Sequence, residues 1–189
     1  MFNSGNTFLC GLDEAGRGPI AGPVVVGVVV FRAGVEVNGV DDSKKLTAKQ
    51  REILLNEILQ RAEAVSVGVS GVEYIEKFNI LEATYDAARQ ALRTLRVRPD
   101  CLINDALTIP QIDYRQVAVI HGDSTCHCVA AASIVAKVMR DRIMAQLEMD
   151  YPGYGFSKHK GYGTREHYRA LRELGLTIVH RRSFRGVLA

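Results

Sequence analysis

Long hydrophobic runs are absent from this chain of 189 residues. The longest uninterrupted apolar stretch, residues 24–31, is far shorter than the roughly 18 residues that a membrane-spanning helix needs. No basic segment precedes an apolar one at the N-terminus, so we expect no secretory signal peptide. With only 4 cysteines, the chain also lacks the density of a disulfide scaffold. These absences predict a cytoplasmic protein that contacts no membrane.

The cysteines do not show the paired spacing that is typical of zinc sites. Cys10 and Cys101 each lie in an apolar segment that we expect to be a strand. Cys126 and Cys128 are too close together for a helical pair to form a disulfide, which favours a reducing compartment. Together with His127 they offer ligand types that zinc prefers, but a structural zinc site needs four ligands. A structural zinc protein is therefore the weaker alternative.

Composition favours one folded domain with an uneven charge. Hydrophobic residues make up 47% of the chain, which excludes an intrinsically disordered protein. A domain usually takes about 100–200 residues, so we expect a single domain over residues 1–189. The net charge of +3 divides into −3 for residues 1–156 and +6 for residues 157–189. We expect a core of about residues 1–150 and a basic C-terminal extension, about 151–189.

Hydrophobic periodicity predicts strands first and then an alternation of strands and helices. The predicted strands are one that leads to Asp13 and those at residues 24–31, 64–70, 101–103 and 117–120. The predicted helices run from Thr47 to about Ala62, from Asn79 to before Pro99, over residues 129–147 with an end at Tyr151-Pro152, and from Thr164 to Gly175. Residues 153–163 are predicted to be a loop. This order predicts an α/β protein with a mixed sheet and surrounding helices.

Two of the predicted helices begin with capping signals. Thr47 and Gln50 have the spacing of a capping box, and Asn79 with Glu82 indicates a second helix start. In the first of these helices we expect the apolar side to contain Ile53, Leu54, Ile58 and Leu59.

Asp13-Glu14 stands at the end of the first predicted strand, just before Gly16-Arg17-Gly18. Adjacent carboxylates point in opposite directions in a regular strand, so one site can use both only if the backbone bends. The glycines permit that bend and a close approach of the backbone to a ligand. An acidic turn is the simplest alternative. A dinucleotide-binding pattern over Gly16, Gly18 and Ala21 is excluded, because Pro19 and a strand follow where a helix must begin.

Two further carboxylates occur at the ends of predicted elements. Asp105 follows the strand at residues 101–103, a common position for a metal ligand, with a solvated loop residue as the alternative. Asp123 precedes the long helix, where a helix N-cap is the alternative. With Asp13 and Glu14, these four acids match the ligands of a two-metal phosphodiester site. Oxygen ligands of this kind suit Mg²⁺ or Mn²⁺.

A basic and aromatic segment, residues 154–164, follows the long helix. Its lysines can neutralise phosphates, and Tyr162 can stack on a sugar or a base. The alternative is a flexible basic loop whose aromatic residue is tucked into the core. The glycines on both sides of Tyr162 weaken that alternative, because they leave little local core around the ring.

Six segments occur in an order that resembles bacterial ribonuclease HII over nearly the whole chain. They are GLDEAGRGPIAGPVV, DDSKKLT, INDAL, HGDSTCHCVAAASIVAKVMRDR, YGFSKHKGYGT and HRRSF. The resemblance implies an RNase H-like mixed β-sheet flanked by helices, with a helical C-terminal extension. It also implies an endonuclease that hydrolyses the RNA strand of RNA–DNA hybrids and nicks duplex DNA on the 5′ side of an embedded ribonucleotide. The products would carry 3′-hydroxyl and 5′-phosphate ends.

The same resemblance implies a role for each matching residue. The catalytic carboxylates, which would bind Mg²⁺ or Mn²⁺, are Asp13, Glu14, Asp105 and Asp123. The 2′-hydroxyl of the ribose would be read by Gly16, Arg17 and Gly18, and the sugar at the RNA–DNA junction would stack on Tyr162. Phosphates would be contacted by Ser43, Lys44, Lys158 and Lys160. The expected partners are RNA–DNA hybrids and ribonucleotide-containing duplexes, bound by a monomer. On this reading the basic extension grips the nucleic acid.

Two features depart from the family pattern, His121 and the triplet Cys126-His127-Cys128, which is treated as variation at the start of the helix. His121 precedes Gly122-Asp123, where the family usually has lysine. Since imidazole titrates near neutrality, this change would make phosphate contact or activity more sensitive to pH. A non-catalytic nucleic-acid-binding module is the main alternative function. The four carboxylates argue against it, because phosphates repel them and binding alone gains nothing from them.

Overall fold

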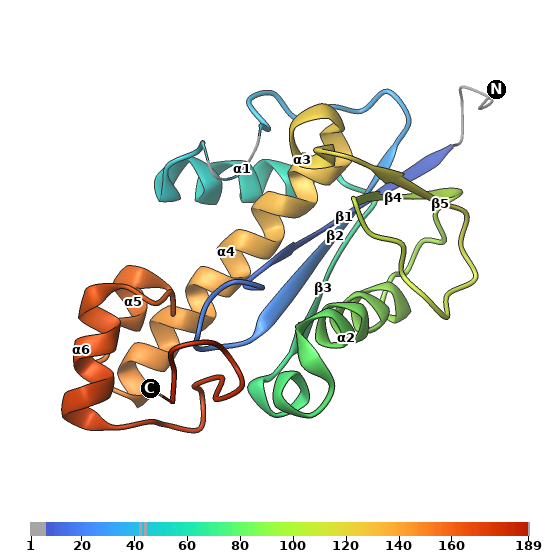
Figure 1. The fold of residues 1–189 in the computed structure, drawn as a ribbon. Coiled ribbons are helices and arrows are strands. Elements are labelled where there is room, and N and C mark those ends of the chain that lie inside the picture. The colour runs from blue at the N-terminus through green and yellow to red at the C-terminus, as the bar shows by residue number, and fades with distance from the viewer. Residues whose placement is uncertain (1–6, 42, 44, 189) are drawn as a thin grey trace.

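The computed structural model describes residues 7–41, 43 and 45–188. Within these residues the chain forms a five-stranded sheet in the order β3-β2-β1-β4-β5 (Figure 1). The strands are β1 (Phe8–Ala15), β2 (Val24–Arg32), β3 (Ala64–Ser70), β4 (Cys101–Asp105) and β5 (Gln116–Val119). The helices are α1 (Ala48–Arg61), α2 (Val72–Arg93), α3 (Gly122–Thr125), α4 (His127–Asp150), α5 (Phe156–His159) and α6 (Arg165–Leu174).

The sheet is mixed, as the sequence predicts. β2 pairs antiparallel with both β1 and β3, whereas β4 runs parallel to β1 and β5 runs parallel to β4. In the register of β1 with β4, Leu12 lies opposite Asn104. The residues that follow them, Asp13 and Asp105, therefore stand at the same edge of the sheet. Carboxyl ends of neighbouring strands commonly form ligand sites in such sheets.

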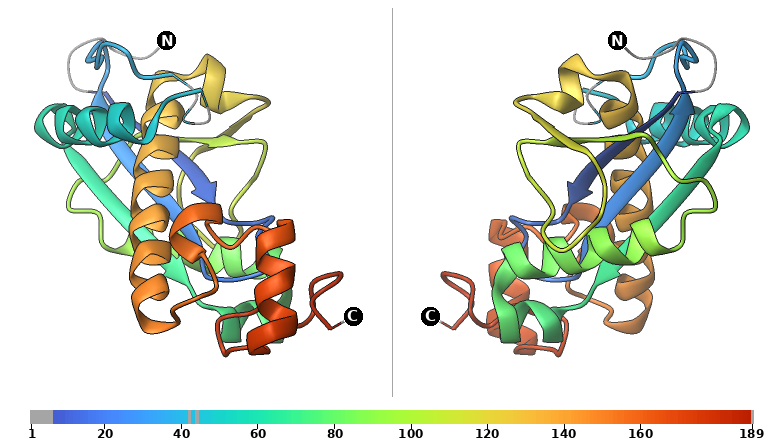
Figure 2. Two further views of the ribbon diagram at one scale, coloured as in Figure 1. Left: turned by 90° about the vertical axis from the view of Figure 1, so that its left-hand side faces the viewer. Right: turned by 90° about the vertical axis from the view of Figure 1, so that its right-hand side faces the viewer.

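α4 and α2 cover opposite faces of the sheet (Figure 2). Both helices approach the sheet backbone to backbone at glycines. A Cβ atom on Gly11 would collide with the carbonyl group of Cys128, and one on Gly27 would collide with the α4 backbone. On the other face, a Cβ atom on Gly68 would collide with the carbonyl group of Ala87 in α2. These close contacts fix α4 directly over β1 and β2, and β1 carries the predicted site residues Asp13 and Glu14.

α1 begins as predicted but buries a different side. The Thr47 and Gln50 side chains each accept a hydrogen bond from the other residue's backbone N–H, which confirms the capping box. The buried residues of the helix are Leu54, Leu55 and Ile58. The prediction was wrong for Ile53 and Leu59, which are 51% and 54% exposed. Each residue turns the helix by about 100°, so both fall outside the narrow arc that packs against α4.

α2 starts earlier than the sequence predicts. It begins at Val72 after Gly71, which has no side chain to serve as a recognisable cap. Asn79, with φ of 75°, interrupts the helix, and its side chain accepts hydrogen bonds from the N–H groups of Leu81 and Glu82. The predicted cap at Asn79 is therefore confirmed, but it lies at a kink within the helix.

α4 runs the full length of the sheet and ends before Pro152, as its apolar period predicts. Polar residues interrupt that period on the side facing the site, among them Ser133, Lys137 and Arg140. Across the described ranges, neither α4 nor any other helix has both the length and the apolar character needed to cross a lipid bilayer.

The C-terminal extension packs against the far end of α4 (Figure 1). An apolar cluster joins Tyr154, Phe156 and Ala170 to Met144 of α4 and to Ala21. The predicted start of α6 at Thr164 and its end at Gly175 are both confirmed. α5 is a single turn of helix within the segment predicted to be a loop. The extension thereby reaches the glycine loop, the segment between β1 and β2 that carries Gly16-Arg17-Gly18.

Candidate active site

A cavity of about 240 Å³ lies where β1 and β4 end. Its lining includes eight residues of the predicted site, namely Asp13, Glu14, Gly16, Arg17, Gly18, Ser43, Asp105 and Tyr162. α4 contributes three more lining residues, Ser133, Lys137 and Arg140. Residues from distant parts of the sequence thus meet around one concave surface.

Asp13 is a buried carboxyl in the wall of this cavity. It is 7% exposed and accepts a 2.8 Å hydrogen bond from the Glu14 backbone N–H. Burial, and then the negative charges of Glu14 and Asp105, raise the pKa of Asp13 from 3.8 to about 7, against the opposing effect of the Ser133 hydroxyl. The surrounding protein therefore compensates the negative charge of Asp13, Glu14 and Asp105 only in part. A bound cation would relieve it.

The backbone bends at the glycines, as the sequence predicts, and not at the acids themselves. β1 stays paired with β2 through Asp13, Glu14 and Ala15. The bend comes at Gly16, whose φ of 104° is strained for residues with a side chain. Both acids still line the cavity, because it lies at the end of the strand. Glu14 also forms a 3.4 Å ion pair with Arg17.

Asp105 and Asp123 are linked through the turn before α4. The Gly122 N–H donates a 2.9 Å hydrogen bond to the Asp105 carboxylate. Asp123, the next residue, is 6% exposed and lies in the short helix α3. The alternative role of Asp123 as the cap of the long helix is wrong, since Cys126 occupies that position. Asp123 is not among the residues that line the cavity, although its neighbour contacts one that does.

Three of the four acids, Asp13, Glu14 and Asp105, line the cavity, and the four do not converge on a single point. Among the described residues, no three His, Cys, Asp or Glu side chains form a compact cluster that could hold a metal ion. Mg²⁺ and Mn²⁺ keep several water ligands and need only a few carboxylates from the protein. An open ring of oxygen donors around a buried, charge-rich Asp13 therefore fits such ions. His127 is engaged elsewhere, because its Nε2 accepts a 3.0 Å hydrogen bond from the Val37 N–H.

Arg181 binds the loop that carries Gly16-Arg17-Gly18, a role that sequence patterns do not indicate. Its guanidinium group is fully buried and donates to the carbonyl oxygens of Gly16 at 2.7 Å, Arg17 at 3.1 Å, Pro19 at 2.8 Å and Gly22 at 2.7 Å. A buried arginine can serve several carbonyl groups because its donors form a rigid fork. Arg181 therefore supports the loop and does not grip nucleic acid, which corrects the expectation for this part of the basic extension.

Arg140 ties the same loop to the segment that carries Tyr162. It is 1% exposed and donates to the carbonyl oxygens of Pro23 at 3.0 Å, Ala21 at 3.2 Å and Lys160 at 2.9 Å. A side chain on Gly16 would collide with this arginine, so the glycine is also required for packing. Helical periodicity places Arg140 on α4 but gives no sign that it is buried.

Tyr162 lies beside the glycine loop, as we expect if both contact the same substrate. Its ring atom Cε1 would be 3.6 Å from a Cβ atom on Gly18, and the side chain is 49% exposed. The Ile20 N–H donates a 2.9 Å hydrogen bond to the Gly161 carbonyl oxygen, which joins the two segments. The alternative of a tyrosine tucked into the core is therefore wrong.

The predicted phosphate contacts differ in their placement. Ser43 is buried in the cavity wall, where its hydroxyl lies 2.7 Å from that of Ser133. Lys158 is paired with Glu166 at 2.7 Å, and Lys160 donates to the Ser157 carbonyl oxygen at 2.6 Å. Neither lysine lines the cavity. Lys44 lies outside the described residues.

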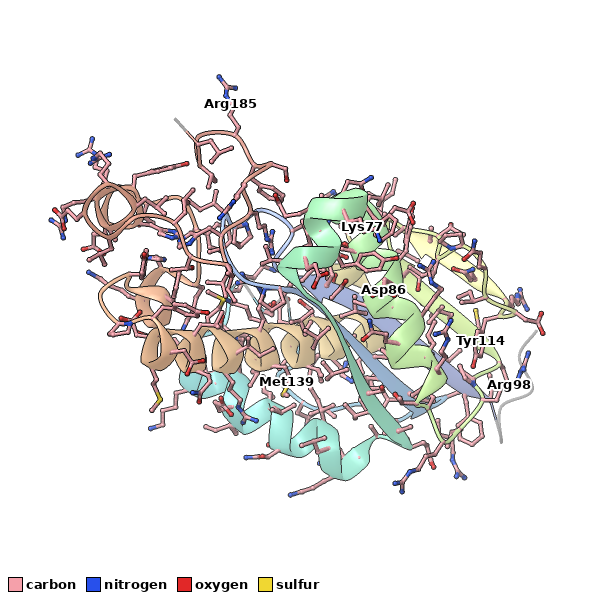
Figure 3. The ribbon with its side chains drawn as sticks, turned by 90° about the horizontal axis from the view of Figure 1, so that it is seen from below. Lys77, Asp86, Arg98, Tyr114, Met139 and Arg185 are labelled. Carbon is pink, nitrogen blue, oxygen red and sulfur yellow. The ribbon has the colours of Figure 1, made fainter. Side chains whose placement is uncertain are left out.

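Exposed basic side chains remain on the extension, so part of its charge can meet a ligand. Figure 3 shows Arg185 extending away from the body of the protein, in contrast to the buried Arg181. The extension therefore has two kinds of arginine, one that supports the site and one that faces solvent.

Comparisons with known proteins agree with this arrangement. The family model described as Ribonuclease HII matches residues 10–187. A ribonuclease HII from Clostridioides difficile (strain 630) is 49% identical over 183 residues, which are 97% of this chain and 72% of that relative.

Solved structures share the fold. The ribonuclease H2 from Pyrococcus horikoshii OT3 matches with a TM-score of 0.83 and 28% identity over 96% of each chain. Bst-RNase HIII, solved in complex with Mn²⁺, matches with a TM-score of 0.75 and 20% identity, covering 98% of this chain and 69% of its own. The family match, the relative and the fold all point to one assignment. This chain belongs to the ribonuclease HII family and is a ribonuclease H enzyme.

Proposed function

We propose that this ribonuclease H hydrolyses the RNA strand of RNA–DNA hybrids and nicks duplex DNA on the 5′ side of an embedded ribonucleotide. The products carry 3′-hydroxyl and 5′-phosphate ends. The observation that carries the proposal is one cavity lined by Asp13, Glu14 and Asp105 together with the Gly16-Arg17-Gly18 loop and Tyr162. Carboxylates for hydrolysis and a backbone surface for the sugar lie side by side there.

The metal ligands of this proposal are Asp13, Glu14, Asp105 and Asp123. A pair of Mg²⁺ or Mn²⁺ ions bound there would lower the pKa of the attacking water and stabilise charge on the phosphate and the leaving oxygen. Asp13 holds its place through the Glu14 N–H, and Asp105 through the Gly122 N–H. The Mn²⁺ in the related Bst-RNase HIII structure supports this choice of ion.

Recognition of the ribonucleotide falls to the glycine loop and Tyr162. Arg181 occupies the carbonyl oxygens of Gly16 and Arg17, so these two peptide units are fixed in direction. Their groups on the cavity side can then read the 2′-hydroxyl, the one group that separates RNA from DNA at a given nucleotide. Tyr162, half exposed beside Gly18, stacks on the neighbouring sugar.

We also propose that the enzyme acts as a monomer in the cytoplasm. All four cysteines are free thiols, which suits a reducing compartment. Light scattering coupled to size-exclusion chromatography tests the monomer, with a mass twice that of the chain as the contradicting result.

The function is tested with a DNA duplex that contains a single ribonucleotide. We expect one nick, 5′ of the ribonucleotide, in Mg²⁺ or Mn²⁺ and none in EDTA. The matched control is the same duplex with a deoxyribonucleotide at that position, which should stay intact. Tight binding of the ribonucleotide duplex without any cut would instead support a non-catalytic binding module.

A further inference from the structure

Cys126 and Cys128 bring their thiols together at the start of α4. The two Sγ atoms are 3.4 Å apart. The sequence suggests a helical pair that cannot bridge, but Cys126 is not helical. It precedes the helix in an extended conformation, with φ of −126° and ψ of 116°, and Cys128 lies in the first turn. The change of conformation between them turns both thiols to the same side.

The two thiols differ in environment. Cys126 is partly exposed, whereas Cys128 is 5% exposed. The Cys128 thiol and the N–H groups of Val129 and Cys128 stabilise the Cys126 thiolate and lower its pKa to about 6, although burial opposes this. The hydrogen bond between the two thiols and burial both raise the pKa of Cys128. Cys126 is thus the accessible nucleophile, and Cys128 is the protonated thiol held against it.

We propose that Cys126 and Cys128 form a dithiol site that reacts with small-molecule disulfides and closes to an intramolecular disulfide. The Cys126 thiolate attacks one sulfur of the small disulfide, forms a mixed disulfide and releases one thiolate. Cys128 then loses its proton to solvent and attacks the Cys126 sulfur, which releases the second thiolate. Two protein thiols are oxidised and one small disulfide is reduced to two thiols.

A disulfide fits this site better than a metal ion does. Across residues 7–41, 43 and 45–188, no third His, Cys, Asp or Glu joins the two thiols in a metal-binding group. Sulfur atoms in a disulfide lie about 2.05 Å apart, so the pair must close by about 1.3 Å. That movement is small enough for a local change at the start of α4.

The movement falls on Cys126 and on α3, because Cys128 is fixed. The Cys128 carbonyl group lies directly against Gly11 of β1, where not even a Cβ atom fits. Cys126 ends α3, and its N–H donates a 2.9 Å hydrogen bond to the Gly122 carbonyl oxygen. α3 carries Asp123, and the Gly122 N–H donates to Asp105. Closing the disulfide therefore displaces two proposed metal ligands, a consequence that rests on the proposed function.

Mass spectrometry of the full-length protein tests the dithiol site directly. Reduced protein is treated with oxidised glutathione under native conditions, and its intact and peptide masses are measured. We expect the loss of two hydrogens in the peptide that spans Cys126 and Cys128, with no glutathione retained. A stable glutathione adduct on the wild-type protein, or no reaction at all, would overturn the proposal.

Variants separate the role of each thiol. Cys128→Ala should retain one glutathione on Cys126, because no second thiol releases it. Cys126→Ser, which places a favoured N-cap residue at this position, should not react at the start of α4. Cys101→Ala is the matched control, since Cys101 is 2% exposed in β4, and it should form the disulfide as the wild type does. Equal reaction at Cys10 or Cys101 would show that no special site exists.

The nicking rate tests the link to the proposed metal ligands. We expect the oxidised protein to nick more slowly by on the order of tenfold to a hundredfold, because a misplacement of about 1 Å can cost that much. Dithiothreitol should restore the rate, and Cys126→Ser should be insensitive to the oxidant. A disulfide that leaves the rate unchanged would overturn the link. If the reduced protein does not nick at all, the proposed function fails, while the mass measurement still decides the dithiol site.

Discussion

Asp13 and Arg181 are both ionisable and buried, but they differ in how fully their neighbours satisfy them. Arg181 has carbonyl oxygens on every donor edge of its guanidinium group. Asp13 has two other carboxylates nearby and only a few hydrogen-bond donors. The incomplete compensation of buried Asp13 suits its proposed role as a metal ligand, whereas the full compensation of Arg181 makes that side chain a rigid support.

Replacing Asp13 by asparagine should stabilise the metal-free protein at alkaline pH. The folded-state pKa of about 7 lies above the ordinary value of 3.8, so the folded state binds more protons between these values. Wild-type stability is therefore lost as pH rises from 3.8 to about 7. We expect Asp13→Asn to raise the free energy of unfolding in EDTA by on the order of 1–3 kcal/mol above that window and by little below it.

Urea unfolding over this pH range measures the effect of Asp13→Asn. Asp113→Asn, at a fully exposed side chain, is the control and should follow the wild-type pH profile. An Asp13→Asn variant that is no more stable than the wild type at alkaline pH in EDTA would contradict the account of this carboxyl.

Arg181→Lys should weaken both the fold and the discrimination of the site. Lysine keeps the charge but cannot serve four carbonyl groups, so we expect a loss of about 2–4 kcal/mol in the free energy of unfolding. Because the glycine loop would relax, the binding preference for a ribonucleotide-containing duplex over an all-DNA duplex should also fall. Fluorescence anisotropy with both duplexes measures this ratio. Arg185→Lys, at an exposed arginine, should change neither quantity, and an unchanged ratio in Arg181→Lys would remove its positioning role.

At the scale of elements, the packing of α4 depends on glycines in the sheet. Gly11 and Gly27 let the helix backbone rest on β1 and β2 without intervening side chains. This close packing determines where Ser133, Lys137 and Arg140 of α4 lie in the cavity wall. The position of the helix is thus part of the site.

Gly27→Ala should destabilise the protein by at least about 1–3 kcal/mol, because the new methyl group overlaps the α4 backbone. Gly71→Ala is the matched control, since no atom lies within 4 Å of a Cβ there and its φ is −77°. Thermal and urea unfolding of both variants measure the difference. Equal stability of the two would show that α4 can shift to make room.

At the scale of the whole molecule, the C-terminal extension and the core share one site. The Nε2 atoms of His167 and His180 are 3.1 Å apart, so one of them donates a hydrogen bond and the other accepts it. Tyr154 and Phe156 pack against this pair and cover the end of α4. Arg181 follows directly and reaches the glycine loop. A change in the packing of the histidine pair would therefore displace Arg181 and, through it, the glycine loop.

The histidine pair makes the stability of the protein fall in acid. Burial, and then His167, lower the pKa of His180 from 6.5 to about 4, so the folded state prefers neutral rings. This contribution is present above pH 6.5 and is lost as pH falls toward 4. Urea unfolding across this range should show a shallower pH dependence for His180→Gln than for the wild type. His121→Gln, at an exposed histidine, should keep the wild-type slope, and a wild-type slope in His180→Gln would contradict this prediction.

The sequence predicts the parts of this protein that local patterns determine. The valine-rich run of β2, the capping box of α1 and the caps of α6 all depend on residues close together in the chain. The acids at strand ends, with the family resemblance, indicated the cavity. Arg181 could not be recognised in this way, because its partner Gly16 is 165 residues away. Burial of Arg140 and the exposure of Ile53 likewise depend on packing between distant elements.

Cleavage beside a ribonucleotide depends, in the proposed function, on Asp13 as a catalytic metal ligand. Cleavage of a single-ribonucleotide duplex by wild type and Asp13→Asn, in saturating Mg²⁺ and with binding measured in parallel, tests it most directly. We predict that Asp13→Asn loses at least about a thousandfold in rate, because metal binding and activation of water both depend on that carboxylate, while it still binds the duplex. Cleavage at the wild-type rate by Asp13→Asn would show that the Asp13 carboxylate is not a metal ligand that the reaction needs.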